Sequence, residues 1–130
     1  MANSSIIPDT CAWIDFFRGV QTPLAAAVEQ AIITGSVVTC GVILYELTQG
    51  IKNSQEETTL VTAFNAVPFL DTLRQHWIEA GRLSAALRAK GHTLPLSDML
   101  IAVLAKERGA TVLTVDKHFS TIPGLAVSSA

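Results

Sequence analysis

The chain has 130 residues, 49% of them hydrophobic and 15% charged, and its formal net charge is −2. These values predict one folded domain, residues 1–130, and exclude a disordered protein. No run of about 18 apolar residues is present, so no membrane-spanning helix is predicted. Residues 1–5 lack a basic region followed by an apolar stretch. This argues against a signal peptide and leads us to expect a cytoplasmic protein.

Strands and helices are predicted to alternate from one end of the chain to the other. Glycines that follow helical stretches, such as Gly19 and Gly35, mark helix ends. Pro8 lacks the N–H that a central strand needs, so the first strand is expected to end before it. In chain order, the expected elements are a strand at 4–7, helices at 10–18 and 23–34, a strand at 37–39, helices at 41–49 and 54–65, a strand at 67–70, helices at 72–90 and 97–108, a strand at 111–115, a short helix from Lys117 and a strand at 125–127.

This order of elements predicts the fold class. Residues 99–105 are apolar on nearly every side, which is typical of a central, buried helix that Ser97 could cap. The strand at 111–115 is rich in β-branched residues. Repeated alternation of strands and helices predicts an α/β fold, in which right-handed crossovers place helices on both faces of a parallel sheet.

Four acidic residues occur where ligands bind in such a sheet, beyond the carboxyl ends of the strands. Asp9 directly follows the first strand, and Asp116 directly follows the strand at 111–115. Glu46 lies about one and a half turns into the helix after the second strand, and Asp98 is at the start of the buried helix. The four carboxylates are therefore expected to converge at one edge of the sheet.

Each of these acids also has an ordinary explanation. Asp9 or Asp98 could cap a helix, Glu46 could be an exposed helical residue, and Asp116 could lie in a turn. Four carboxylates in one small apolar domain would nevertheless repel one another, unless their pKa values rise or a cation joins them. Because all the ligand atoms would be oxygen, such a site favours Mg²⁺ or Mn²⁺.

Cysteines and histidines show no spacing typical of metal ligands. Cys11 and Cys40 are isolated and are expected to be buried, reduced thiols. The histidines form no HxH or HExxH pattern, which argues against zinc. The sequence leaves open whether several side chains contact phosphates or are surface charges: Arg18, Lys90, His92, Lys117 and His118.

Four ordered motifs resemble those of PIN-domain proteins, specifically the VapC toxins. The motifs are DTCAWIDFFRG at 9–19, YEL at 45–47, PLSDMLIA at 95–102, and TVDKHF at 114–119 followed by IPG at 122–124. The resemblance extends from about Ile6 to Val127, which is nearly the whole chain. Pro8 departs from the aliphatic residue that is more usual at its position in that family.

The resemblance implies a parallel sheet in the order 3-2-1-4-5 flanked by helices, Mg²⁺- or Mn²⁺-dependent cleavage of RNA, and inhibition by a VapB-type antitoxin. It also implies that Asp9, Glu46, Asp98 and Asp116 form the catalytic, metal-binding site, with Thr114 as a hydroxyl beside the fourth acid. The metal ions would activate a water molecule and stabilise the leaving 3′-oxygen. Asp98 or Glu46 could receive the proton of that water.

Two further features of the first motif have alternative roles. Asp15 lies nearly two helical turns beyond Asp9, which favours a surface or partner contact over metal ligation. Trp13, Phe16 and Phe17 are either core residues or an apolar patch that binds an antitoxin helix or a second copy of the chain.

The main alternative is a catalytically inactive PIN-like module that only binds protein or RNA partners, and the presence of all four acids argues against it. A receiver domain would need an acidic pair after its first strand and a lysine after its last. A haloacid-dehalogenase-type phosphatase would need DxD where this chain has Asp9-Thr10-Cys11. The RNA target and the number of metal ions stay open, whereas the apolar content and the helical arms favour a homodimer.

Overall fold

The structure of the protein, a computed structural model, describes residues 4–130. The expectation about residues 1–5 therefore lies partly outside the described residues. Helices and strands alternate along the chain, as predicted. In chain order they are β1 (Ile6–Pro8), α1 (Thr10–Phe17), α2 (Pro23–Thr34), β2 (Thr39–Cys40), α3 (Gly41–Gln49), α4 (Ser54–Asn65), β3 (Phe69–Leu70), α5 (Arg74–Ala89), α6 (Leu96–Arg108), β4 (Thr111–Leu113), the 3₁₀ helix η1 (Lys117–Thr121) and β5 (Ala126–Ser128).

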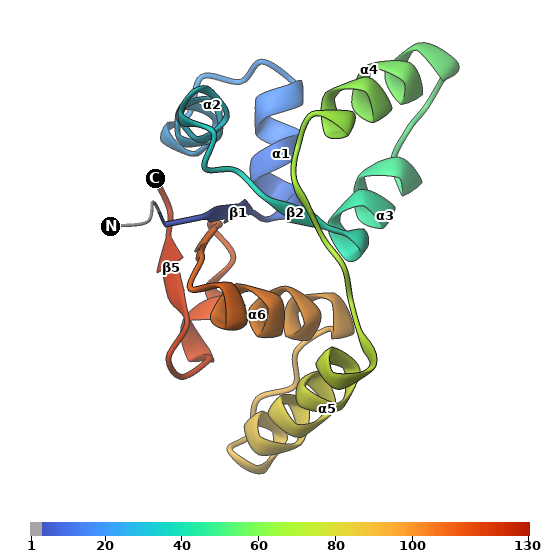
Figure 1. Ribbon diagram of the computed structural model, residues 1–130. Coiled ribbons are helices and arrows are strands. Elements are labelled where there is room, and N and C mark those ends of the chain that lie inside the picture. Colours follow the sequence, from blue (N-terminus) through green and yellow to red (C-terminus); the bar gives the residue numbers. More distant parts are fainter. Residues whose placement is uncertain (1–3) are drawn as a thin grey trace.

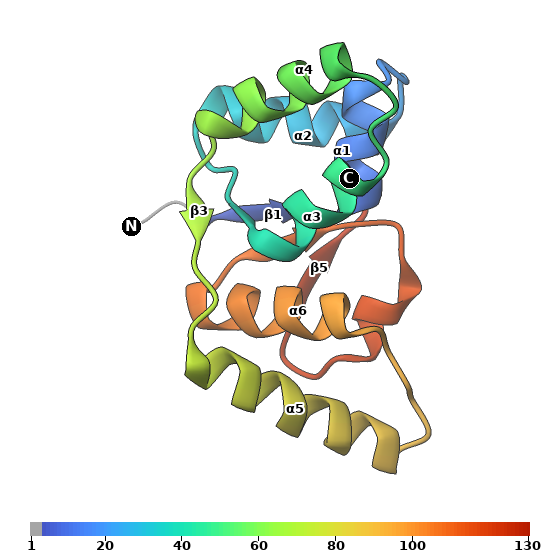
Figure 2. The same ribbon diagram turned by 90° about the vertical axis from the view of Figure 1, so that its right-hand side faces the viewer.

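Helices cover the strands on two sides, which confirms the predicted three-layer α/β architecture. Helices α1, α2 and α4 lie on one side of the strands, and α6 lies on the other side (Figure 1). Helix α5 packs on the outer face of α6, so that it forms the outermost element on that side (Figure 2). Among residues 4–130, no helix is both long enough and apolar enough to cross a membrane.

The strands form two parallel sheets, one with the order β1-β4-β5 and one that pairs β2 with β3. A single bridge between Ile6 and Val37 joins them. In this bridge the Ile6 N–H donates to the Ser36 carbonyl at 2.8 Å, and the Val38 N–H donates to the Ile6 carbonyl at 2.8 Å. The bridge lies between β1 and the residues that lead into β2, so the predicted order 3-2-1-4-5 is not confirmed as one continuous sheet.

Pro8 explains why the contact between the two sheets is so short. The prediction that β1 ends before this residue is wrong, because Pro8 pairs with Leu113 as the last residue of β1. Successive N–H groups of a strand point to opposite sides: that of Ile6 points to Ser36, and that of Asp9 points to Leu113. The Pro8 nitrogen therefore faces the β2 side. Since it carries no hydrogen to donate there, the ladder between the sheets stops at Ile6.

Helix α6 is the central helix that the sequence predicts. Its side chains from Met99 to Ala105 are at most 5% exposed. Gly109, with a φ of 68°, ends the helix in the left-handed conformation and lets the chain turn directly into β4. The predicted Ser97 cap is wrong, because the helix already begins at Leu96. The preceding residue, Pro95, offers no side-chain acceptor, and its φ of −61° is compatible with the start of a helix.

Several predicted elements differ from the observed ones by a few residues at one or both ends. These predicted ranges are 4–7, 10–18, 37–39, 67–70, 72–90, 111–115 and 125–127. The strand at 111–115 has the clearest physical reason for the difference. Its β-branched pattern continues through Thr114 and Val115, but β4 loses its ladder partner where β1 ends at Pro8. The chain turns there, and Val115 is 60% exposed.

Candidate functional site

Acidic residues gather at the carboxyl ends of β1 and β4. Asp9 follows β1 and is the N-cap residue of α1, whereas Asp116 follows β4 and is the N-cap residue of η1. Because β1 and β4 are parallel neighbours, both residues lie at the same edge of the sheet. Asp98 comes to this edge from the first turn of α6, and Glu46 belongs to α3.

The Asp9 carboxylate is buried and held by two hydrogen bonds. The residue is 7% exposed. Its Oδ1 accepts from the Thr10 N–H at 2.7 Å, and its Oδ2 accepts from the Thr114 hydroxyl at 3.0 Å. Burial raises the pKa of Asp9, the two hydrogen bonds oppose that rise, and the charges of Glu46 and Asp116 add to it. The two hydrogen bonds thus fix the orientation of the Asp9 carboxylate, and the surrounding residues shield it from solvent.

Thr114 links the acids of β1 and β4. Its hydroxyl donates to Asp9 and accepts from the backbone N–H of Asp116 at 2.9 Å, and the residue is 2% exposed. The Cys11 sulfur lies 3.6 Å from the Thr114 hydroxyl and 3.7 Å from Asp9 Oδ2. Burial raises the pKa of the Cys11 thiol, which favours its neutral form. Cys40 is buried as predicted, whereas Cys11 is only half-buried.

Thr10 links the first and second acids, and the sequence analysis did not single it out. Its backbone N–H donates to Asp9, and its hydroxyl donates to Glu46 Oε1 at 2.5 Å. One residue of α1 therefore holds an acid at the end of β1 and an acid in the middle of α3. The signal available in the sequence was a hydroxyl residue directly after the first acid.

Asp98 is the least exposed of the four acids, and one of its carboxylate oxygens has no hydrogen-bond partner. It is 6% exposed, and its Oδ2 has no hydrogen-bond partner anywhere in residues 4–130. Burial, together with the charges of Asp9 and Asp116, raises its pKa from an ordinary 3.8 to about 6, although His118 opposes the rise. A buried carboxylate in this state is costly, so the position favours a cation nearby.

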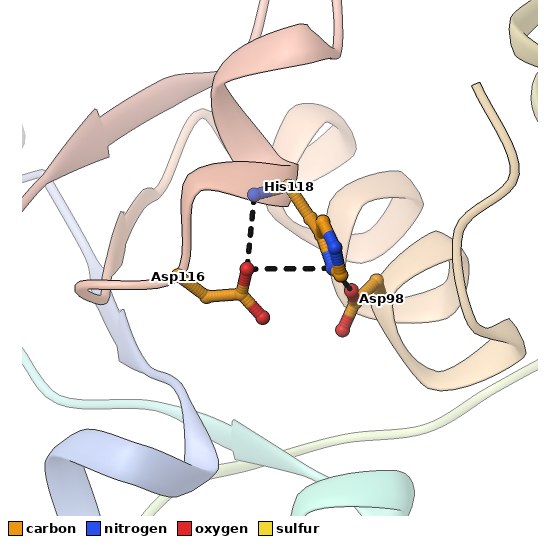
Figure 3. Close-up of side chains that lie close together, drawn as sticks. All are labelled: Asp98, Asp116 and His118. Atoms are coloured by element: carbon orange, nitrogen blue, oxygen red, sulfur yellow. Dashed lines mark hydrogen bonds and ion pairs between the residues drawn. The ribbon is translucent and has the colours of Figure 1, made fainter. Parts of the chain in front are cut away.

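His118 completes the cluster, and the sequence analysis treated it only as a possible phosphate contact or surface charge. Its Nδ1 lies 3.4 Å from Asp98 Oδ2 and 3.4 Å from Asp116 Oδ1 (Figure 3). Its backbone N–H donates to Asp116 Oδ1 at 2.9 Å. One ligand atom from each of the three residues lies within 4.8 Å of the others. The spacing between histidines gave no sign of this contact. The available signal was that His118 lies two residues after an acid at the start of a helix.

Other residues of the first motif lie outside the cluster. Asp15 Oδ2 accepts a hydrogen bond from the Thr22 hydroxyl at 3.3 Å, so it ties α1 to the N-terminus of α2. Trp13 is 1% exposed and packs against Phe17 and Phe64, with ring centroids 5.8 and 4.7 Å away. The core alternative is therefore confirmed for Trp13. All five of the candidates for phosphate contacts are exposed: Arg18, Lys90, His92, Lys117 and His118.

A cleft of about 550 Å³ opens beside Glu46, between α1, α3 and α4. Ile14 and Leu47 contribute apolar walls, and the cations Arg18 and Lys52 line the cleft together with the acids Glu46 and Glu56. The surface next to the acidic cluster is therefore partly apolar and carries charges of both signs.

The donor set of the cluster fits a divalent cation. Carboxylate oxygens are the ligands that Mg²⁺ and Mn²⁺ prefer. The raised pKa values of Asp9 and Asp98 and the unpartnered Oδ2 of Asp98 all reflect anionic groups that a cation would stabilise.

Comparison with known proteins gives consistent results. Residues 6–125 match the PIN domain family. Ribonuclease VapC11 of Mycobacterium tuberculosis and VapC ribonuclease Mb1587 of Mycobacterium bovis are each 31% identical to this chain over 121 residues. The match covers 90% of this chain and 90% of each relative. In the crystal structure of DNA-bound VapBC from Salmonella typhimurium, one chain superposes with a TM-score of 0.81 at 22% identity, over 97% of this chain and 98% of that one.

Proposed function

The chain belongs to the PIN domain family and, within it, to the VapC ribonucleases, and we propose that it is a metal-dependent endoribonuclease that acts as the toxin of a toxin–antitoxin pair. The observation that carries this proposal is the convergence of buried carboxylates at the ends of β1 and β4. Asp98, with its unpartnered oxygen, and Asp9 are withheld from solvent although both carry negative charge when ionised.

In this proposal Asp9, Glu46, Asp98 and Asp116 hold Mg²⁺ or Mn²⁺. Such an ion, when bound, lowers the pKa of water and neutralises charge on a phosphate. Thr114 acts as a positioning residue, because its hydroxyl orients Asp9 and its acceptor oxygen anchors the Asp116 backbone. Thr10 is likewise a positioning residue, because its hydroxyl orients the Glu46 carboxylate.

Hydrolysis of a phosphodiester also needs a group that receives the proton of the attacking water. Glu46 and Asp98 are the two candidates. Glu46 lies beside the cleft and is partly solvated, so a proton taken there could pass to solvent. Asp98 has a pKa of about 6, which is nearer to neutrality than that of an ordinary carboxyl. The proton leaves the water as its oxygen attacks phosphorus, and the 3′-oxygen of the RNA is the leaving group.

A VapB-type antitoxin is the proposed protein partner. The solved structures of similar fold include VapBC-5 from Mycobacterium tuberculosis, which is described as a member of the VapBC family of toxin–antitoxin systems. We also propose a homodimer, which the half-exposed apolar side chains of Leu73 and Trp77 support.

The proposed domain, residues 1–130, is supported by one continuous cluster of buried apolar side chains from Ile7 to Ile122. A cytoplasmic location would follow from an RNA substrate inside the cell.

The alternative, an inactive PIN-like binding module, is less well supported. Such a module would not require Asp98 to lie buried near Asp9 and Asp116, because the mutual repulsion of these carboxylates lowers stability without a cation. It would also not need Thr10 and Thr114 to orient two of those carboxylates.

The test is RNA cleavage and metal binding by the purified chain. With Mg²⁺ or Mn²⁺ we expect cleavage of a single-stranded RNA and a rise in Tm, and both should be lost in Asp9→Asn/Asp116→Asn. Asp15→Asn is the matched control, since this acid lies in the same helix as the N-cap Asp9 but contacts Thr22. A wild-type protein that neither binds the metals nor cuts RNA, with Asp15→Asn behaving identically, would leave the binding-module alternative standing.

A further inference from the structure

We propose that His118 is a direct nitrogen ligand of the metal, so that Asp98, Asp116 and His118 form a mixed-donor site that prefers Mn²⁺ or another transition ion over Mg²⁺. This inference rests on the proposed function, because it concerns the same metal centre. It departs from the sequence analysis, which expected only oxygen ligands.

The contacts of His118 with Asp98 and Asp116 are ion pairs when the imidazole is protonated, and their lengths also match the separation of two ligand atoms on one ion. Nδ1 lies 3.4 Å from Asp98 Oδ2 and 3.4 Å from Asp116 Oδ1. Both separations exceed the usual range for a nitrogen–oxygen hydrogen bond, about 2.7 to 3.2 Å. Ligand atoms held about 2.1 Å from one ion lie about 3.0 to 3.4 Å apart in octahedral or tetrahedral geometry.

The unpartnered oxygen is an independent observation that points to a ligand. Asp98 is 6% exposed, and its Oδ2 accepts no hydrogen bond from any described residue. This same atom is the one that faces His118 Nδ1 (Figure 3). An ion between the three donor atoms would satisfy Asp98 Oδ2 and give the imidazole lone pair a partner.

The backbone fixes His118 in this position. Asp116 caps η1 by accepting the His118 N–H at 2.9 Å, and Thr114 in turn anchors the Asp116 N–H at 2.9 Å. Phe119, the next residue, is fully buried and anchors η1 in the core. The imidazole itself is 55% exposed, so that its removal should not disturb packing.

Imidazole changes the metal preference because Mg²⁺ binds oxygen ligands and retains water, whereas Mn²⁺ and later transition ions accept nitrogen readily. A site with His118 as a ligand should therefore discriminate between the two ions. Without the imidazole, the remaining carboxylates should bind both ions as an ordinary all-oxygen site.

Pulsed electron paramagnetic resonance of the Mn²⁺-loaded protein tests the inference directly, with Mn²⁺ alone as the probe. We expect ¹⁴N modulation from a coordinated imidazole in the wild type and in His92→Gln, and its loss in His118→Gln. His92 is the matched control, because it is an exposed histidine in the turn between α5 and α6. The Kd for Mn²⁺ should rise about tenfold in His118→Gln, while the Kd for Mg²⁺ changes about twofold or less.

The outcomes separate this inference from the proposed function. If wild-type protein binds Mn²⁺ and cuts RNA but shows no ¹⁴N modulation, or if His118→Gln retains the modulation, His118 is not a ligand and the nuclease proposal stands. If the wild type binds neither Mn²⁺ nor Mg²⁺, both the mixed-donor site and the metal-dependent nuclease are wrong.

Discussion

Thr114 and Asp9, 105 positions apart in the chain, are joined by a hydrogen bond of 3.0 Å from the threonine hydroxyl to Asp9 Oδ2. The same hydroxyl oxygen accepts the Asp116 N–H. One buried side chain therefore sets the relative position of two acids that belong to different strands. The contact is possible because β1 and β4 are parallel neighbours whose ladder ends at Pro8 and Leu113.

Replacement of Thr114 by valine should lower RNA cleavage about tenfold, because it removes a hydrogen bond to a charged group and leaves Asp9 free to rotate. Thr114→Ser keeps the hydroxyl and should retain most of the activity. Single-turnover cleavage at saturating Mn²⁺ measures the effect, with the Kd for Mn²⁺ determined separately. Equal rates for the valine and serine variants would exclude a positioning role for the hydroxyl.

Much of the fold could be predicted because the sequence carries strong local signals. The helices at 23–34, 41–49 and 54–65 have the predicted boundaries. Glycine and proline residues lie at or near the ends of these helices, and the periodicity of hydrophobic residues defines their buried faces. Strand ends were predicted less well, since a strand ends where its neighbour ends. The end of β4 at Leu113 depends on Pro8, more than a hundred residues earlier.

The positions of Asp9, Asp98 and Asp116 near one edge could be predicted because each follows a strand or lies in the first turn of a helix next to one, and parallel topology brings such positions together. Glu46 lies in the middle of α3, and its contact with the Thr10 hydroxyl is seen only in the structure. Thr10 and His118 could not be found in this way. Thr10 acts through a hydroxyl that reaches a different helix, and His118 acts through the direction in which η1 turns. Their positions directly after Asp9 and two residues after Asp116 are visible in the sequence, but only the three-dimensional placement shows which groups they contact.

Asp98→Asn should abolish RNA cleavage and stabilise the metal-free protein. The amide removes a negative charge whose burial, together with repulsion from Asp9 and Asp116, raises the pKa of Asp98 to about 6. We expect the free energy of unfolding at pH 7 to increase by about 1 to 3 kcal/mol, as a pKa difference of about two units implies. Urea denaturation in EDTA measures it. Destabilisation of the asparagine variant would contradict this account of Asp98.

The stability of the metal-free wild type should fall as pH rises from about 4 to about 6. In this window the folded protein keeps a proton on Asp98, whose pKa is about 6, whereas the unfolded chain, with an ordinary value of 3.8, has lost it. The folded state thus binds more protons, so raising the pH lowers the free energy of unfolding until the folded pKa is passed.

The raised pKa of Asp9 acts in the same direction. The slope should therefore be smaller, but not zero, in Asp98→Asn. Urea denaturation at half-unit pH intervals tests this dependence. A stability that increases over the same interval would mean that neither carboxyl has a raised pKa.

Removal of the two cations of the cleft, Arg18→Ala/Lys52→Ala, should weaken RNA binding without changing the chemical step. Both side chains line the cleft beside Glu46, where they can attract phosphates next to the scissile one. We expect the KM to rise about three- to tenfold at low salt and kcat to stay within about twofold. Arg82→Ala/Arg88→Ala removes the same charge from α5 and should leave KM nearly unchanged. Equal effects of the two pairs would indicate net charge rather than a local contact.

The contact between His76 and Glu107 should stabilise the fold at a distance from the site. Nδ1 of His76 accepts the Leu73 N–H at 2.8 Å, so Nε2 carries the hydrogen that Glu107 Oε1 accepts at 2.8 Å. His76 is 3% exposed and joins the start of α5 to the last turn of α6. His76→Ala removes both hydrogen bonds and a buried side chain, so it should lower the free energy of unfolding by about 1 to 3 kcal/mol.

His92→Ala is the control for this stability measurement, because its side chain is exposed. Asp98 lies in the first turn of α6, at the opposite end of the helix from Glu107. The Kd for Mn²⁺ of folded His76→Ala should therefore equal that of the wild type, since the loss is confined to the contact with α5. A Kd that rises in parallel with the loss of stability would mean that the position of α5 controls the acidic cluster through α6.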